Sequence, residues 1–122
     1  VIKWWKLAGE QGFPIALHNL GGMYETGRGV SKNYKTAAKW YRLAAEKGLT
    51  DSLFKLGYLY ATGLGVPRND VIAYMWADIA ASSGHNNANK LQHFLAKELT
   101  TAQIAEGQKL ARECVRQKYK GC

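Results

Sequence analysis

Two stripes of apolar residues at helical spacing mark the middle of the chain. The first stripe consists of Ala37, Trp40, Tyr41, Ala44 and Ala45, and the second of Leu49, Leu53, Leu56, Leu59 and Tyr60. Apolar residues that recur every three or four positions form the buried face of an α-helix. Gly48 separates the stripes, at a position where a helix commonly ends in a left-handed residue. The pattern therefore predicts a helical hairpin.

The same pattern recurs on both sides of this hairpin. Three sets of residues fall in one register, 36 positions apart: Trp4, Trp40 and Trp76; Ala8, Ala44 and Ala80; Gly12, Gly48 and Gly84. Self-similarity at a fixed period is the signature of a repeat array, in which stacked units bury a continuous core. We expect Ala8, Ala44 and Ala80, together with the flat Gly21 and Gly57, to allow close helix approach, and the three tryptophans to act as core spacers.

Start and stop signals set the boundaries of the elements. Asn33 and Asn69 can accept hydrogen bonds from first-turn amides as N-caps, and Gly63, Gly65 and Pro67 interrupt the helical pattern. The sequence predicts helices over residues 2–11, 13–25, 33–47, 49–61, 69–83, 85–98 and 101–117. The expected fold class is all-α, with no strands.

The repeat pattern decays after residue 84. Gln92 and His93 stand where the preceding copy has Leu and Gly, as expected of a terminal repeat that meets water. Thr100 and Gln103 form a capping-box pattern before a helix with one apolar face. We predict a repeat array over 1–98, consisting of a partial repeat 1–12, repeats at about 13–48 and 49–84 and a degenerate copy 85–98. A capping helix and basic tail follow over 99–122.

Two copies share the motif A/S-x3-L-G-x2-Y-x2-G-x-G-V, at residues 16–30 and 52–66. An Ala pair, an aromatic pair and a second Ala pair follow, and the whole pattern resembles the Sel1-like repeat, a relative of the tetratricopeptide repeat. The resemblance covers roughly residues 1 to 98. It implies a right-handed α-solenoid that serves as a protein-interaction scaffold, frequently in bacterial envelope or secreted proteins, and it implies no catalytic residue. The family usually has Asp where this chain has Asn33 and Asn69, and either residue can form the cap.

Composition adds a positive charge to this picture. Lys and Arg number 17 against 9 Asp and Glu, a net charge of +8, which permits anionic partners although most of these cations are expected on solvated helix faces. No apolar run approaches the roughly 20 residues of a membrane-spanning helix. The chain begins at Val1 inside a predicted helix, so we expect any signal peptide to lie outside it. Only the family resemblance favours a periplasmic or secreted location.

Signals for catalysis are weak. Ser52 and Lys55 match the S-x-x-K motif of penicillin-recognising enzymes, but the companion motifs are absent. Ser52 also occupies the small-residue packing position that Ala16 and Ala88 hold in the other copies, so we expect a structural role. We predict that the protein is not an enzyme.

Cofactor and metal signals are also missing from the sequence. The three histidines, His18, His85 and His93, have no Cys or acidic neighbour at metal-ligand spacing. The glycine pairs follow helices and not strands, which excludes the fingerprints of nucleotide-binding loops. We predict no metal and no cofactor.

Cys114 and Cys122 are the two cysteines of the chain. A continuous helix would hold their Cα atoms about 12 Å apart, beyond the roughly 7 Å that a disulfide allows. A bond therefore requires the helix to end near Lys118, and an oxidising compartment. Both the bonded and the free state fit the sequence.

Aligned positions outside the core register define a candidate binding groove. In a solenoid of this kind the first helix of each repeat (13–25, 49–61 and 85–98) lines the concave side, which points to His18, Asn19, Phe54, Lys55, Tyr58, Lys90 and Phe94. An aromatic and basic strip suits a peptide with acidic and apolar side chains. Packing of the three aromatic residues against the next hairpin is the structural alternative.

We therefore predict a non-catalytic scaffold that binds a protein or peptide partner. Nucleic acid is an unlikely partner, because the signal for it is the +8 charge alone. Two alternatives stay open at this point: a basic solenoid that binds an anionic polymer, either nucleic acid or glycan, and a weak penicillin-binding or β-lactamase-like activity.

Overall fold

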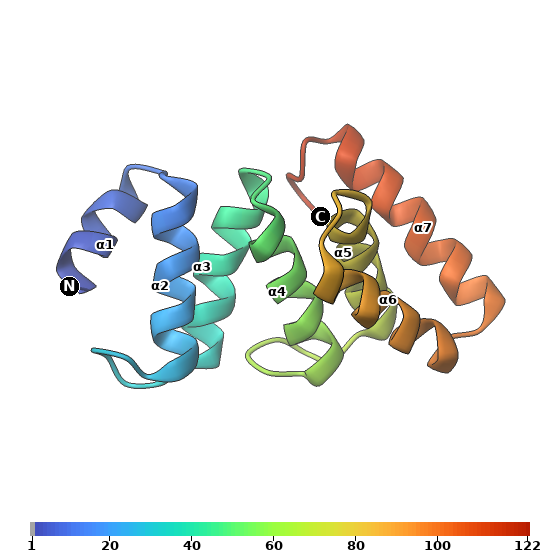
Figure 1. The fold of residues 1–122 in the computed structure, drawn as a ribbon, viewed down its shortest axis with the longest axis horizontal. Helices are drawn as coiled ribbons and strands as arrows, with labels where there is room; N and C mark the ends of the chain where they lie inside the picture. The colour runs from blue at the N-terminus through green and yellow to red at the C-terminus, as the bar shows by residue number, and fades with distance from the viewer. Residues whose placement is uncertain (1) are drawn as a thin grey trace.

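Seven α-helices form the part of the chain that the computed structural model describes, residues 2–122. They are α1 (Ile2–Glu10), α2 (Pro14–Thr26), α3 (Tyr34–Glu46), α4 (Thr50–Thr62), α5 (Asp70–Ser82), α6 (Asn86–Glu98) and α7 (Thr101–Arg116). The helices stack as successive hairpins along one axis, and α7 lies across the far end (Figure 1). Residues 2–122 contain no strand. The all-α solenoid is confirmed, and every helix boundary lies within one residue of its predicted position.

The predicted caps are present. The Asn33 side chain accepts a hydrogen bond from the Thr36 amide at 3.0 Å, and Asn69 accepts from the amides of Val71 and Ile72. Thr100 and Gln103 form the reciprocal capping box. These local bonds satisfy amides that a helix start leaves without partners, which explains why the sequence located the boundaries so closely.

The main core lies where α3, α4, α5 and α7 meet. Tyr41, Leu56 and Trp76 are buried there among the small residues of the neighbouring helices. Gly57 allows α4 to approach α5 closely, because a Cβ atom at this position would lie 3.2 Å from the carbonyl oxygen of Ala73. The close helix approach predicted for Gly57 is confirmed at this contact.

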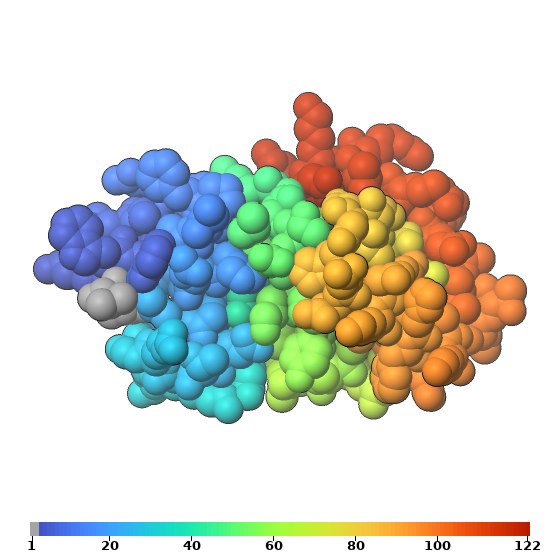
Figure 2. Space-filling view, viewed as in Figure 1, coloured from blue at the N-terminus to red at the C-terminus, as the bar shows by residue number. Residues whose placement is uncertain are grey.

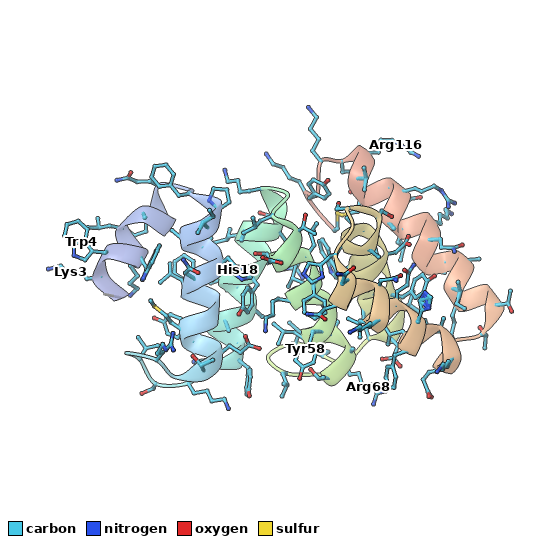
Figure 3. All side chains as sticks on the ribbon, viewed as in Figure 1. Lys3, Trp4, His18, Tyr58, Arg68 and Arg116 are labelled. Carbon is cyan, nitrogen blue, oxygen red and sulfur yellow. A yellow bond between two sulfur atoms is a disulfide. The ribbon has the colours of Figure 1, made fainter. Side chains whose placement is uncertain are left out.

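The three tryptophans in register have different environments. Trp76 is 0% exposed and Trp40 is 9% exposed, whereas Trp4 is 76% exposed and points away from the N-terminal end of the array (Figure 3). The expectation of a core spacer is correct for Trp40 and Trp76 and wrong for Trp4. Trp40 packs with Leu17 and Leu20 of α2, but no described helix packs on the outer side of α1.

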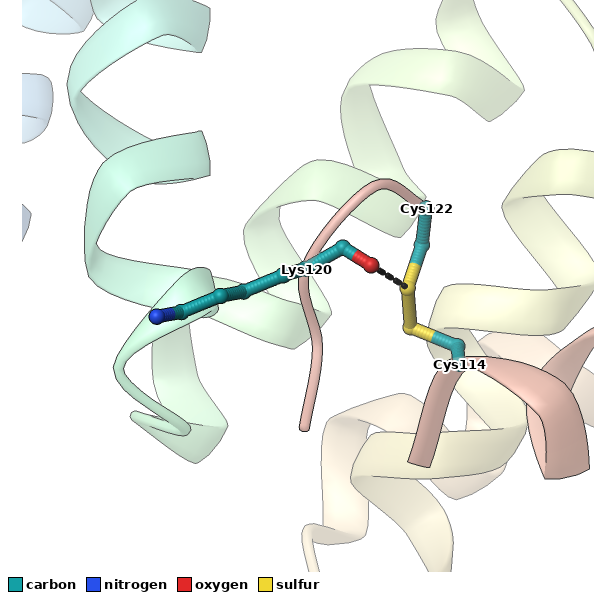
Figure 4. Close-up of a disulfide and its surroundings, with 3 residues drawn as sticks. All are labelled: Cys114, Lys120 and Cys122. Atoms are coloured by element: carbon teal, nitrogen blue, oxygen red, sulfur yellow. Dashed lines mark hydrogen bonds between the residues drawn. A yellow bond between two sulfur atoms is a disulfide. The ribbon is translucent and has the colours of Figure 1, made fainter. Parts of the chain in front are cut away.

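A disulfide joins Cys114 and Cys122, with their Cα atoms 5.6 Å apart (Figure 4). The bond forms because α7 ends at Arg116 and the next residues turn back, with φ of 57° at Lys118 and 68° at Tyr119. The helix thus ends near Lys118, which is the condition that a bond between these two cysteines requires. The Cys122 Sγ lies 3.8 Å from the Lys120 carbonyl oxygen, but a disulfide sulfur has no proton to donate, so this is a contact and not a hydrogen bond.

The disulfide holds the C-terminal tail, residues 117–122, against the array. The Tyr119 ring lies 3.1 Å from the point where a Cβ atom of Gly48 would stand, at the turn between α3 and α4. Tyr119 and Cys122 also pack against the main core. The tail therefore connects α7 to the turn between α3 and α4.

Candidate binding groove

Helices α2, α4 and α6 present one face of the array, which is the near face in Figure 2. A hollow of about 630 Å³ lies between α2 and α4 on this face. We call it the groove hollow. Its lining includes three of the predicted site residues, His18, Asn19 and Lys55, together with Met23 and Tyr41. The side chains of His18 and Tyr58 are both visible from this side (Figure 3).

Glu25 is the residue at this site that sequence reasoning missed. Its carboxylate accepts a hydrogen bond from the Tyr41 hydroxyl at 2.7 Å and lies 3.2 Å from the Lys55 ammonium nitrogen. Burial, and then the Glu25 carboxylate, raise the pKa of the Tyr41 phenol above its ordinary value. The charge of Lys55 is therefore balanced within the groove, so the basic strip expected from the sequence is not continuous.

His18 and Ser52 form a second polar contact at the base of the groove hollow. The His18 Nδ1 lies 2.7 Å from the Ser52 Oγ, and the imidazole ring packs at a tilt against Tyr41. Ser52 is 0% exposed, while the Lys55 ammonium points to Glu25. These contacts favour a structural role for Ser52, because a nucleophile must be reachable by its substrate.

We expect His18 to make the free energy of unfolding depend on pH. Burial is the main cause of its pKa lying below the ordinary 6.5; Asp51 and Glu25 oppose the shift and Lys55 adds to it. The unfolded chain therefore takes up a proton at a higher pH than the folded chain. The contribution of the neutral imidazole to the free energy of unfolding is therefore fully present above pH 6.5. It is lost as the pH falls through the pKa that His18 has in the folded chain.

Urea unfolding at about pH 7.5 and about pH 5.5, on either side of the ordinary histidine pKa, measures this dependence. His18→Gln should flatten the difference between the two free energies, and His93→Gln, a change at an exposed histidine of α6, should leave it as in the wild type. If the difference between the two free energies is the same in His18→Gln as in the wild type, the pH dependence comes from other groups.

The aromatic part of the candidate site lies further along α4 and α6. Phe54 stacks on His85, with ring centroids 4.8 Å apart, and is half-buried against the core. Packing against the next hairpin, the alternative to a binding role, therefore describes Phe54 well. Tyr58 is 39% exposed and Phe94 is 61% exposed. Lys90 is also exposed on α6. The site thus divides into the groove hollow, which Asn19 lines, and an exposed aromatic surface.

His85 has a structural part in this arrangement. Its Nδ1 accepts a hydrogen bond from the Ala88 amide at 3.0 Å, so its Nε2 is free to donate to the Asp51 carboxylate, 2.9 Å away. Together these bonds cap α6 and tie it to α4.

Among residues 2–122 there is no group of three His, Cys, Asp or Glu side chains that could hold a metal ion. Within the same residues no helix combines the length and the apolar character needed to cross a bilayer.

A family model for the Sel1 repeat matches residues 2–13, 14–49 and 50–85. The chain belongs to the Sel1 repeat family. Proteins with Sel1 repeats generally mediate protein–protein interactions, and the family is one of non-catalytic scaffolds. The resemblance found in the sequence is thereby confirmed, because the matched segments contain the register tryptophans and both glycine loops.

Two solved structures resemble this Sel1 repeat chain. One is c5321, described as a protective antigen present in uropathogenic Escherichia coli strains and displaying an SLR fold; it shows 32% sequence identity and a TM-score of 0.90 over 97% of the present chain. The chain spans only 26% of the length of that antigen. The other is a Sel1 repeat protein from Oxalobacter formigenes, with 38% identity and a TM-score of 0.73, covering 75% of this chain and 69% of that one. No curated protein matches the chain.

Proposed function

We propose that this Sel1 repeat chain is a non-catalytic scaffold that binds a partner protein or peptide along the face formed by α2, α4 and α6. The contact residues in this proposal are His18, Asn19, Phe54, Lys55, Tyr58, Lys90 and Phe94. The observation that carries it is the groove hollow of about 630 Å³ on the same face as two exposed aromatic side chains, Tyr58 and Phe94. Exposed aromatic residues beside a hollow are typical of the anchor points of interfaces.

The charges of the groove specify the kind of partner. Lys55 is already paired with Glu25, so the groove hollow has little need of a negative partner at that point. Asn19 and the His18 ring can exchange hydrogen bonds with a peptide backbone, while Tyr58 and Phe94 can cover apolar side chains. We expect a segment rich in apolar residues, with a carboxylate where it passes Lys90 or Arg28, a further cation in the lining of the groove hollow.

The test uses the double change Tyr58→Ala with Phe94→Ala. The partner is first isolated from the native host with the wild-type chain and identified by mass spectrometry, and its dissociation constant is then measured by calorimetry. Loss of two aromatic anchors should weaken binding by about 2–4 kcal/mol, or 30- to 1000-fold. Phe54 is left unchanged because it also packs against the core.

The matched control is Phe13→Ala with Val115→Ala, which removes two apolar side chains of similar exposure, 56% and 49%, outside the groove hollow. It should bind as the wild type does, with a shallow dependence on salt. A partner that binds the Tyr58 and Phe94 variant with unchanged affinity would refute the proposal that this face is the binding site. Affinity that collapses between low and moderate salt would instead favour the anionic-polymer alternative.

A further inference from the structure

A second surface of the chain has an excess of positive charge, and its carboxylates, Glu10 and Glu46, line a neighbouring hollow with Lys39. Between Glu25 and Glu46 the sequence contains five Lys and Arg residues and no carboxylate side chain. Three of them, Lys35, Lys39 and Arg42, follow one another at helical spacing on the same face of α3. We call these three residues the α3 stripe.

The α3 stripe borders a hollow of about 500 Å³ that shares no lining residue with the groove hollow. Its other walls are Leu43 of α3 and the loop residues Gly65 and Val66. No carboxylate lines this hollow, and the ion pairs of residues 2–122 leave the stripe untouched, since they use other cations. Its charges are therefore available to an anionic ligand.

Packing holds both walls of the hollow in place. Arg42 donates a hydrogen bond to the Tyr60 hydroxyl, and its guanidinium lies 5.9 Å from the Tyr60 ring centroid and 6.0 Å from that of Trp76. The opposite loop lies directly on α3: a Cβ atom at Gly65 would be only 2.3 Å from the carbonyl oxygen of Tyr34. Because Arg42 is already held in place, ordering of the site should cost a ligand little of its binding free energy.

We propose that the α3 stripe binds an acidic polysaccharide. Carboxylate or sulfate groups of the chain pair with Lys35, Lys39 and Arg42, which extend about 10 Å along the helix axis. The apolar faces of the sugar rings lie against Leu43 and Val66. This function is additional to partner binding in the groove, because the two surfaces have no residue in common.

Two other anionic ligands fit the surface less well. Single-stranded nucleic acid is held by stacking on exposed aromatic rings, and no aromatic side chain lines this hollow. A bilayer surface calls for several exposed apolar side chains on the basic face, where Leu43, 37% exposed, is the one large apolar side chain exposed along the described lining. The disulfide between Cys114 and Cys122 also indicates an oxidising compartment, where extracellular glycans occur.

The test measures binding to heparin, used as a soluble acidic polysaccharide, by affinity chromatography and calorimetry. The variant is Lys35→Gln with Lys39→Gln; Arg42 is kept because it packs against Tyr60 and Trp76. The affinity should fall at least tenfold, and the slope of log affinity against log salt should become shallower by about two.

The matched control is Lys109→Gln with Arg116→Gln, which removes the same charge from exposed positions of α7 and should change the affinity less than about twofold. Circular dichroism of all three proteins checks that they fold equally. An equal loss in both variants would show attraction by net charge alone and overturn the proposal. Tighter binding to duplex DNA or to phosphatidylglycerol vesicles than to heparin, lost through the same Lys35 and Lys39 changes, would overturn it in favour of that ligand.

Discussion

Trp76→Ala is expected to lower the free energy of unfolding by about 3–5 kcal/mol. The Trp76 side chain is fully buried in the core between α4 and α5, and Gly57 of α4 lies against its Cβ atom. Removal of an indole leaves a cavity that rigid helices held by close backbone contact cannot fill. A loss of this size is a large fraction of the stability of an ordinary domain.

The repeat register supplies controls of the same residue type. Trp40→Ala should cost nearly as much as Trp76→Ala, because Trp40 is 9% exposed, whereas Trp4→Ala should change stability by no more than about 0.5 kcal/mol, because Trp4 is 76% exposed. Urea unfolding followed by circular dichroism measures all three. Three equal losses, or none at Trp76, would contradict the described packing.

Cys122→Ser is expected to cost about 2.5 kcal/mol of folding stability. The disulfide closes a loop with a sequence separation of 8 residues, and a loop of this length restricts the unfolded chain by about that amount. The effect extends beyond the tail, because Tyr119 packs on the turn at Gly48. We expect residues 117–122 to detach from the array once the bond is lost.

A reductant provides the control for this substitution. Dithiothreitol should lower the stability of the wild type to that of Cys122→Ser and should leave the variant unchanged. Hydrogen exchange should increase at Tyr119 in both cases. Two free thiols in the wild-type protein, denatured without reductant, would contradict the bond and with it the indication of an oxidising compartment.

The sequence by itself determined the helices, their boundaries and the repeat. These features depend on local chemistry: apolar spacing selects the helix, Asn33 and Asn69 accept bonds within a few residues, and positive φ at Gly48 and Gly84 ends the preceding turns. The motif at residues 52–66 was sufficient to indicate the family. Interactions between near neighbours are encoded where they occur, so their pattern alone predicts them.

Only the tertiary structure decided the environment of each residue in that pattern. Trp4 and Trp76 occupy the same register position, but α4 covers Trp76 and no described helix covers the outer face of α1. The pairing of Lys55 with Glu25 joins residues 30 positions apart, and no local signal marks it. The disulfide depends on the direction of the chain after Arg116, which left-handed φ angles at Lys118 and Tyr119 set. Burial, charge balance and cross-linking are properties of neighbours in space, and spacing along the chain does not contain them.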